Sequence, residues 1–258
     1  MNKIHPTAIL SAKAKLGVNI EIGPFTIIED DVEIGDGTKI GPNVGIYNGA
    51  RIGKNVKIFQ GASVSNFPQD LKFAGEQTFF FVGDNTTIRE FVTLHKGTTA
   101  TGKSAVGSNC LLMAYVHVAH DCQIGNNCIL ANSVQIGGHV HIDDYVIIGG
   151  STPVHQFTKI GMHAMIGGGF RTTVDIPPYV LAGGEPLRYS GLNVVGLRRR
   201  GFSNEDIAIL KNAYSIIFGK ELNFADALSK VKEIYPDHKL VGNILKFFDE
   251  STRAILKR

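Results

Sequence analysis

Residues 124–142 read IGNNCILANSVQIGGHVHI, and every sixth position in this stretch is a branched aliphatic residue: Ile124, Leu130, Ile136 and Ile142. The same spacing runs from Ile4 to Ile166 and is broken only at Asp70, Glu76 and Ala100. A short fixed period indicates identical units stacked on one another. The sequence therefore predicts a mainly β protein, with a parallel β-helix built from hexapeptides.

Three hexads, about 18 residues, would close one three-sided coil with the aliphatic side chain pointing inward, and coils would stack about 4.8 Å apart. Glycine often follows the aliphatic residue, as in Gly125 and Gly137, which suits a corner with no room for a Cβ atom. Small or β-branched residues stand two positions before it, as an inner corner requires. The period does not determine the handedness of the coil.

Two segments of low repeat quality, residues 65–81 and 97–105, are expected to leave the coil as loops, where functional residues are often found. The repeat region is assigned to residues 1–190 and a helical domain to residues 191–258. Ser203 and Asn223 are suitable helix caps, and a last helix is expected from His238 to Leu256.

Composition narrows the class of protein. From Arg198 onward the chain has 12 Lys and Arg against 8 Asp and Glu, which is too small an excess for a nucleic-acid-binding protein but suits a phosphate-bearing ligand or an acidic partner. No apolar run reaches membrane-spanning length, and no signal peptide precedes the repeat. The three cysteines fall in the small-residue column, so we expect buried thiols and a cytoplasmic protein.

Residues 97–104, GTTATGKS, match the phosphate-binding loop pattern. That loop functions only where a helix follows it and presents its N-terminal amides to the phosphates. Here the hexapeptide pattern resumes at Val106, so the match is rejected.

Histidines concentrate in the second half of the coil. If residues 18 apart stack, His120 lies beneath Gly138, which lies beneath Gln156. A histidine next to a residue without a side chain offers a base and a bare backbone N–H, the minimum that acyl transfer needs. A zinc site made by several histidines is the alternative reading.

Several motifs along the chain resemble those of the bacterial UDP-N-acetylglucosamine acyltransferases of lipid A biosynthesis. They are residues 68–76 (PQDLKFAGE), 93–97 (TLHKG), 117–122 (HVAHDC), 136–139 (IGGH), 154–157 (VHQF), 175–179 (DIPPY) and 196–203 (GLRRRGFS). Their order and spacing fit over nearly the whole chain.

The resemblance implies a left-handed β-helix, a homotrimer with active sites between subunits, and transfer of an (R)-3-hydroxyacyl chain from acyl carrier protein. It implies His120 as general base, Asp121 as its orienting carboxylate and Gly138 as oxyanion donor. Substrate-binding positions are implied at Gln69, Lys72, His117, His139, His155, Gln156, Asn193, Arg199 and Arg200. No metal and no cofactor beyond the donor's phosphopantetheine is implied.

The resemblance also implies that Gly168 sets the acyl length, and that glycine there admits a long chain. Two positions depart from the family pattern: Pro186 replaces a linker histidine and Val195 an acidic residue. They leave open whether the sugar carries a 3-hydroxyl or a 3-amine. The rivals are another hexapeptide transferase using acetyl-CoA, a zinc enzyme of carbonic-anhydrase type, and a purely structural β-helix.

Overall fold

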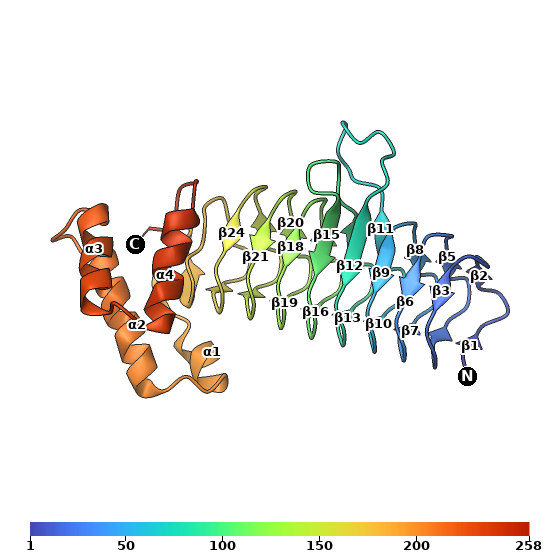
Figure 1. Ribbon diagram of the computed structural model, residues 1–258, viewed down its shortest axis with the longest axis horizontal. Coiled ribbons are helices and arrows are strands. Elements are labelled where there is room, and N and C mark those ends of the chain that lie inside the picture. Colours follow the sequence, from blue (N-terminus) through green and yellow to red (C-terminus); the bar gives the residue numbers. More distant parts are fainter. Residues whose placement is uncertain (258) are drawn as a thin grey trace.

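The computed structural model describes residues 1–257, and from Lys3 to Ile166 the chain is a regular coil of very short parallel strands (Figure 1). Consecutive strands enter three different sheets in turn. Register partners such as Lys3 and Glu21, or His117 and Gln135, are 18 residues apart. The predicted coil of three hexads is confirmed.

The coil has three faces, which we call A, B and C in the order in which the chain visits them. Face A contains β1 (Lys3–Ile4), β4 (Glu21–Ile22), β7 (Lys39–Ile40), β10 (Lys57–Ile58), β13 (Thr87–Ile88), β16 (Leu111–Leu112), β19 (Ile129–Leu130), β22 (Ile147–Ile148), β25 (Met165–Ile166), β26 (Val180–Gly183) and β27 (Arg188–Leu192). Face B contains β2 (Ile9–Leu10), β5 (Ile27–Ile28), β8 (Gly45–Ile46), β11 (Ser63–Asn66), β14 (Thr93–His95), β17 (His117–Val118), β20 (Gln135–Ile136) and β23 (Pro153–Val154). Face C contains β3 (Lys15–Leu16), β6 (Glu33–Ile34), β9 (Ala50–Ile52), β12 (Phe79–Val82), β15 (Lys103–Val106), β18 (Gln123–Ile124), β21 (His141–Ile142) and β24 (Lys159–Ile160). The chain turns between faces at edges AB, BC and CA.

The core of the coil is the aliphatic column together with the small-residue column. The side chain of every sixth residue is buried in the inner coils, as at Ile46, Leu94 and Ile136. Burying one such side chain contributes roughly 1.5–3 kcal/mol. All three cysteines are buried and free, as the sequence predicts.

Where glycine follows the aliphatic residue, it is required by close stacking. A Cβ atom at Gly35 would lie 2.6 Å from the carbonyl carbon of Gly53 on the next coil. The left-handed backbone falls two residues after the glycine position, at residues such as Asn55 and Tyr145, with φ of 54° and 63°. The six-residue period did not reveal these left-handed corners.

Both predicted loops leave the coil at edge BC, where they project from the prism (Figure 1). Their bounds are narrower than expected, residues 67–78 and 96–102, because residues 79–81 and 103–105 belong to β12 and β15. Phe80 is fully buried and pairs with Ala50 on the coil below. The segment after Gly102 is a strand, which confirms the rejection of the phosphate-loop pattern.

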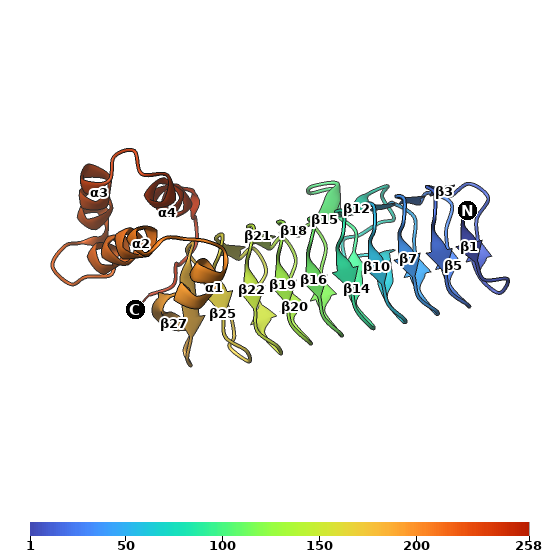
Figure 2. The same cartoon turned by 90° about the horizontal axis from the view of Figure 1, so that it is seen from below.

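Four helices follow the coil at its C-terminal end (Figure 2): α1 (Val194–Arg199), α2 (Asn204–Ile217), α3 (Phe224–Ile234) and α4 (Lys239–Glu250). Ser203 caps α2 in a capping box with Asp206, and Asn223 caps α3, as expected. The last helix ends at Glu250 and not near Leu256. The segment after it instead pairs with the coil, where Asp175 exchanges backbone hydrogen bonds with Ala254 and Leu256.

Within residues 1–257, none of the helices combines the length and the apolar character needed to cross a bilayer.

Candidate active site

The strongest candidate for chemistry is the His120–Asp121 pair, at the turn between β17 and β18 on edge BC. Neighbouring residues of a strand point to opposite faces, but Asp121 has a left-handed φ of 59° and the chain turns there. His120 Nδ1–H donates a 2.8 Å hydrogen bond to Asp121 Oδ2. This leaves Nε2 of the imidazole as the nitrogen that can accept a proton.

The carboxylate of Asp121 is completely buried and is held by the loop of residues 96–102. Thr98 donates to it twice, from its backbone N–H to Oδ1 at 3.0 Å and from its hydroxyl to Oδ2 at 2.8 Å. The Thr101 hydroxyl also donates to Oδ1, and it shares its single proton with the Lys103 carbonyl oxygen at 2.8 Å. Burial by itself would raise the pKa of Asp121, but the hydrogen bonds from Thr101, His120 and Thr98 outweigh it and lower this pKa to about 2.

Gly138 lies directly above His120, as the stacking arithmetic predicts. A Cβ atom at Gly138 would come within 2.8 Å of both Cε1 and Nε2 of the imidazole, so only glycine leaves the ring in this position. Within residues 1–257, no acceptor is found for the Gly138 backbone N–H. The free side of the imidazole thus lies next to an unpaired backbone donor.

Three further histidines surround this pair. The His139 ring lies edge-on to His120 at 5.1 Å between centroids and stacks on Phe157 at 4.5 Å. His117 shares a 2.8 Å hydrogen bond with Thr93 and packs edge-on against His95. Burial, with the nearby His117 and His120, lowers the pKa of His95 to about 4, so His95 is neutral near pH 7.

The other predicted residues on edge BC are open to solvent. Gln69 and Lys72 are exposed on the loop of residues 67–78, and His155 and Gln156 are exposed one coil above Gly138. Glu76 links the two loops, because its Oε1 accepts a 3.3 Å hydrogen bond from the Thr99 backbone N–H.

Asn193, Arg199 and Arg200 lie at a different edge, CA. Asn193 is 4% exposed, and its side chain caps α1 through the Gly196 N–H and donates to the His163 carbonyl. Arg200 lies over the Tyr145 ring with its Nη1 3.4 Å from His163 Nδ1, and burial lowers the pKa of this guanidinium. Arg199 is exposed.

Gly168 lies at the third edge, AB, after β25. A Cβ atom there would lie 3.1 Å from the Gly150 carbonyl oxygen. One copy of the chain therefore distributes the predicted residues over all three edges of the prism. The residues of edge BC lie together, but those of edges CA and AB lie apart from them.

Comparisons with known proteins show the family to which the chain belongs. A family model described as UDP-N-acetylglucosamine O-acyltransferase, domain 2, matches residues 175–256, and a model of bacterial transferase hexapeptide repeats matches residues 13–48, 31–66 and 103–138. An acyl-[acyl-carrier-protein]--UDP-N-acetylglucosamine O-acyltransferase from Chlorobium phaeobacteroides is 59% identical over 98% of this chain and 97% of its own length. The chain belongs to this acyltransferase family.

Solved structures of the family agree. A UDP-N-acetylglucosamine acyltransferase from Bacteroides fragilis is 49% identical and superposes with a TM-score of 0.96 over 98% of this chain and 100% of its own. A second one, from Acinetobacter baumannii, is 42% identical with a TM-score of 0.95 over 98% and 99% of the two chains. The chain is thus an acyltransferase with the left-handed β-helix expected from the resemblance.

One group of residues on edge BC has a composition that could hold a metal ion. His120, Asp121 and His139 each place one possible ligand atom within 4.8 Å of the others. However, the Asp121 carboxylate already accepts hydrogen bonds from Thr98, Thr101 and His120. These donors compete with a cation for the same oxygens, and that the enzyme works without a metal stays a prediction.

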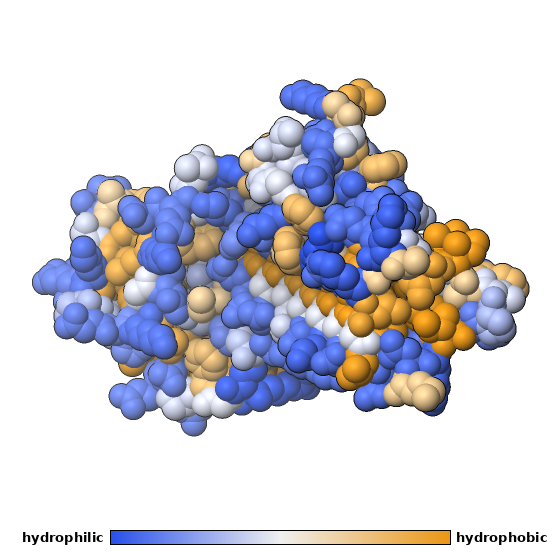
Figure 3. Space-filling model, turned by 45° about the vertical axis from the view of Figure 1, so that its right-hand side comes forward, coloured by the Kyte–Doolittle hydropathy of each residue, from blue (hydrophilic) through white to orange (hydrophobic). Residues whose placement is uncertain are grey.

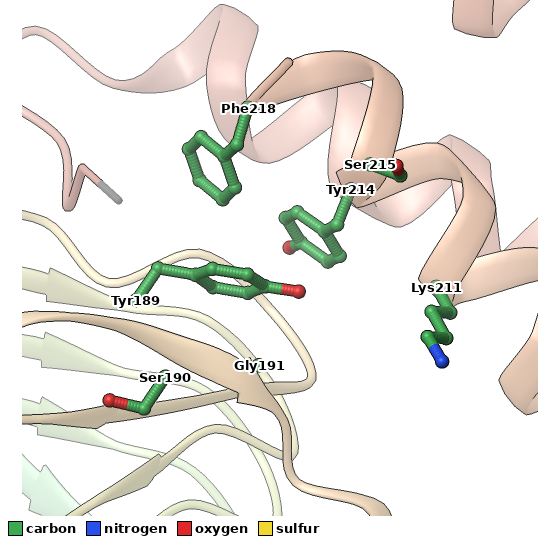
Figure 4. A pocket seen from close by; sticks show the side chains of 7 residues that line it. All are labelled: Tyr189, Ser190, Gly191, Lys211, Tyr214, Ser215 and Phe218. Atoms are coloured by element: carbon green, nitrogen blue, oxygen red, sulfur yellow. The ribbon is translucent and has the colours of Figure 1, made fainter.

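A separate cavity of about 330 Å³ lies between β27 and α2 (Figure 4). It is lined by Tyr189, Ser190, Gly191, Lys211, Tyr214, Ser215 and Phe218. No histidine or carboxylate is among these lining residues, so this cavity lacks the acid–base groups that acyl transfer needs.

The sequence did not reveal the roles of Thr98 and Thr101, nor the enclosed position of His95. Thr98 and Thr101 lie in the segment that resembles a phosphate-binding loop. A loop's composition does not show where it folds back, so only the coordinates place these hydroxyls on Asp121.

Proposed function

We propose that this acyltransferase moves an (R)-3-hydroxyacyl chain from acyl carrier protein to the glucosamine 3-hydroxyl of UDP-N-acetylglucosamine, the first step of lipid A biosynthesis. The observation that carries the proposal is the His120–Asp121 pair beside Gly138. The donor and the acceptor are those in the names of the relatives. We place the reaction in the cytoplasm, in keeping with three unpaired cysteines.

In the proposed mechanism, His120 Nε2 accepts the proton of the sugar hydroxyl while its oxygen attacks the thioester carbon. Asp121 holds Nδ1–H, which fixes the tautomer that leaves Nε2 free. Because its pKa is about 2, Asp121 remains ionised at neutral pH and stabilises the imidazolium that forms.

The negative charge that develops on the thioester oxygen needs a hydrogen-bond donor, and the Gly138 N–H is available for it. When the tetrahedral intermediate collapses, the carbon–sulfur bond breaks. The phosphopantetheine thiol then leaves with the proton that His120 carried. No metal or further cofactor is needed for this balance.

Substrate binding is assigned to two sets of residues. On edge BC these are Gln69, Lys72, His117, His139, His155 and Gln156, and on edge CA they are Asn193, Arg199 and Arg200. Guanidinium groups suit the pyrophosphate of the nucleotide or the acidic surface of the carrier protein.

The distribution of these residues over separate edges supports a homotrimer, in which a neighbouring copy completes the site. Exposed apolar residues also favour a contact between copies. They are Phe25, Phe91 and Tyr115 on edge AB, and Ile9 and Ile27 on face B. Apolar surface gathers toward the N-terminal end of the coil in Figure 3. Such surface is typically covered by a partner.

The test of the reaction is product analysis by mass spectrometry, with UDP-N-acetylglucosamine and acyl carrier proteins loaded with chains of mixed length. The expected product carries an ester at the sugar 3-position. Acetyl transfer from acetyl-CoA, or acylation only of a 3-amino sugar, would contradict the proposal.

The shared site is tested by mixing two inactive variants. His120→Ala and Arg200→Ala subunits, refolded together, should recover activity because some interfaces then receive one intact edge from each copy. A stable, active monomer in light scattering, at 27.9 kDa, would contradict the trimer.

A further inference from the structure

The short loop of residues 96–102 is hydrogen-bonded to the catalytic pair through Asp121. Of the hydrogen bonds that the Asp121 carboxylate accepts, one comes from His120 and three from Thr98 and Thr101. Thr98 is 7% exposed and Asp121 4% exposed, so water does not easily replace the Thr98 donors, whereas Thr101 is an exposed residue of the loop. The loop therefore occupies the sites on the carboxylate that His120 does not use.

The loop is itself held in place at several points. The Thr78 hydroxyl donates to the Gly97 carbonyl at 2.6 Å, and the Gly102 N–H donates to the Thr98 carbonyl at 2.8 Å. A Cβ atom at Gly97 would lie 2.3 Å from the Lys103 nitrogen, so the two ends of the loop are tightly apposed. The threonine hydroxyls are thus presented from a closed turn.

We propose that Thr98 and Thr101 are positioning residues, which fix the rotation of the Asp121 carboxylate so that Oδ2 meets His120 Nδ1 and Nε2 stays free for the sugar hydroxyl. A carboxylate has two equivalent oxygens and a broad torsion about its last bond. Donors on both oxygens remove that freedom. This inference rests on the function proposed above, because it requires His120 to be the base.

The experiment compares kcat and KM for Thr98→Val and Thr101→Val with their conservative partners Thr98→Ser and Thr101→Ser. Valine keeps the shape of threonine and removes only the hydroxyl. We expect each valine variant to lower kcat by about 10-fold and the double variant by about 100-fold, since small misplacements of a catalytic group have effects of this size. The KM for the sugar nucleotide should stay within about twofold, and serine should restore kcat.

The matched control is Thr99→Val on the same loop. The Thr99 side chain is exposed. Within residues 1–257, the one hydrogen bond of this residue is donated by its backbone N–H to Glu76. This variant should keep the wild-type kcat. Equal losses in the Thr99 and Thr101 variants would mean a general disturbance of the loop and would overturn the proposal.

A double-mutant cycle separates positioning from structural effects. In an Asp121→Ala background, Thr101→Val should cause no further loss, because the group on which it acts is gone. An undiminished loss there would overturn the proposal, as would full kcat in both valine variants. If His120→Ala is active, the proposed function fails, whereas an inactive His120→Ala together with fully active valine variants refutes the positioning role alone.

Discussion

Edges CA and BC of the prism have the same backbone turn but use it differently. At edge CA, the corner position is the second residue after the aliphatic one. Its side-chain oxygen accepts a hydrogen bond from the backbone N–H of the same position one coil earlier. This pattern holds for Asp36 with Val18, Asp84 with Lys54, Asn126 with Ser108 and Asp144 with Asn126, at 2.6–2.9 Å. At edge BC the equivalent positions in the catalytic coils are His120, Gly138 and Gln156.

The difference explains how a repeat could acquire the proposed active site. An Asp or Asn at the corner satisfies the backbone donor below it, as buried or crowded amides require. Glycine at position 138 leaves room for the imidazole, and the Gln156 side chain one coil later does not accept from the Gly138 N–H, so edge BC has a base and a free donor. Side-chain choice at one corner position thus separates structural coils from catalytic ones.

A large effect on kcat is expected from adding a side chain at Gly138. Gly138→Ala places a methyl group within 2.8 Å of the His120 ring and forces that ring to move, so kcat should fall by about 10²-fold. The thermal unfolding temperature should change much less than kcat, because the backbone of the coil does not depend on the orientation of this ring. In a His120→Ala background the same change should have almost no effect on the residual rate, and an equally large loss there would contradict the account.

Asp121 should make stability depend on pH. Its pKa is lower in the folded protein than in the unfolded chain, so it stabilises the fold above about pH 4, and this contribution of about 2 kcal/mol is lost as the pH falls to about 2. Unfolding temperatures of the wild type and of Asp121→Asn should differ at pH 7 and converge near pH 2. A gap that does not change with pH would show that the carboxylate is not held in this way.

Acyl length should respond to Gly168, although that residue lies on edge AB. It is 48 residues beyond His120, about 2.7 coils, or roughly 13 Å along the axis. At roughly 1.25 Å per carbon this corresponds to about ten carbons. In the proposed homotrimer, a threefold axis parallel to the coil would keep this height for a neighbouring copy, so that Gly168 would line a chain bound at edge BC of its partner.

The wild type should therefore prefer chains of about fourteen carbons or more, and Gly168→Met should shift the preference toward about ten. Competition between acyl carrier proteins of different chain lengths measures this. An unchanged preference would show that another residue sets the length.

The smallest effect is expected at edge CA. Asp84→Ala removes the 2.7 Å acceptor of the Lys54 N–H at an exposed corner, which should lower the free energy of unfolding by about 1 kcal/mol and leave kcat unchanged. A loss of activity would mean that edge CA has more than a structural role in these coils.

The repeat predicted most of the fold because every coil repeats the same contact. Ile4 to Ile166 gave the coil size, and the 18-residue step placed Gly138 above His120 and Gln156 above Gly138. Helix starts at Ser203 and Asn223 followed from local hydrogen bonding. The prediction that the last helix reaches Leu256 was wrong, because the backbone hydrogen bonds of Asp175 with Ala254 and Leu256 determine where α4 ends.

The site was predictable only where it follows the repeat. The hydroxyls of Thr98 and Thr101 reach Asp121 from an insertion whose path no period describes. The 18-residue step places Gly168 on another edge than His120, because their separation is not a multiple of 18. It does not place Asn193, which lies beyond the last hexad, and it does not say how copies assemble.

The most direct test of the catalytic edge compares two histidines that each contact a carboxylate. His141 Nε2 lies 3.1 Å from Asp143 Oδ1 on face C, away from an open glycine corner, whereas His120 contacts Asp121 beside Gly138. The account predicts that His120→Ala lowers kcat by 10²–10⁴-fold, the usual contribution of a general base, and that His141→Ala leaves it unchanged. A His120→Ala enzyme that keeps more than about half of the wild-type rate, or equal losses in the two variants, would contradict it.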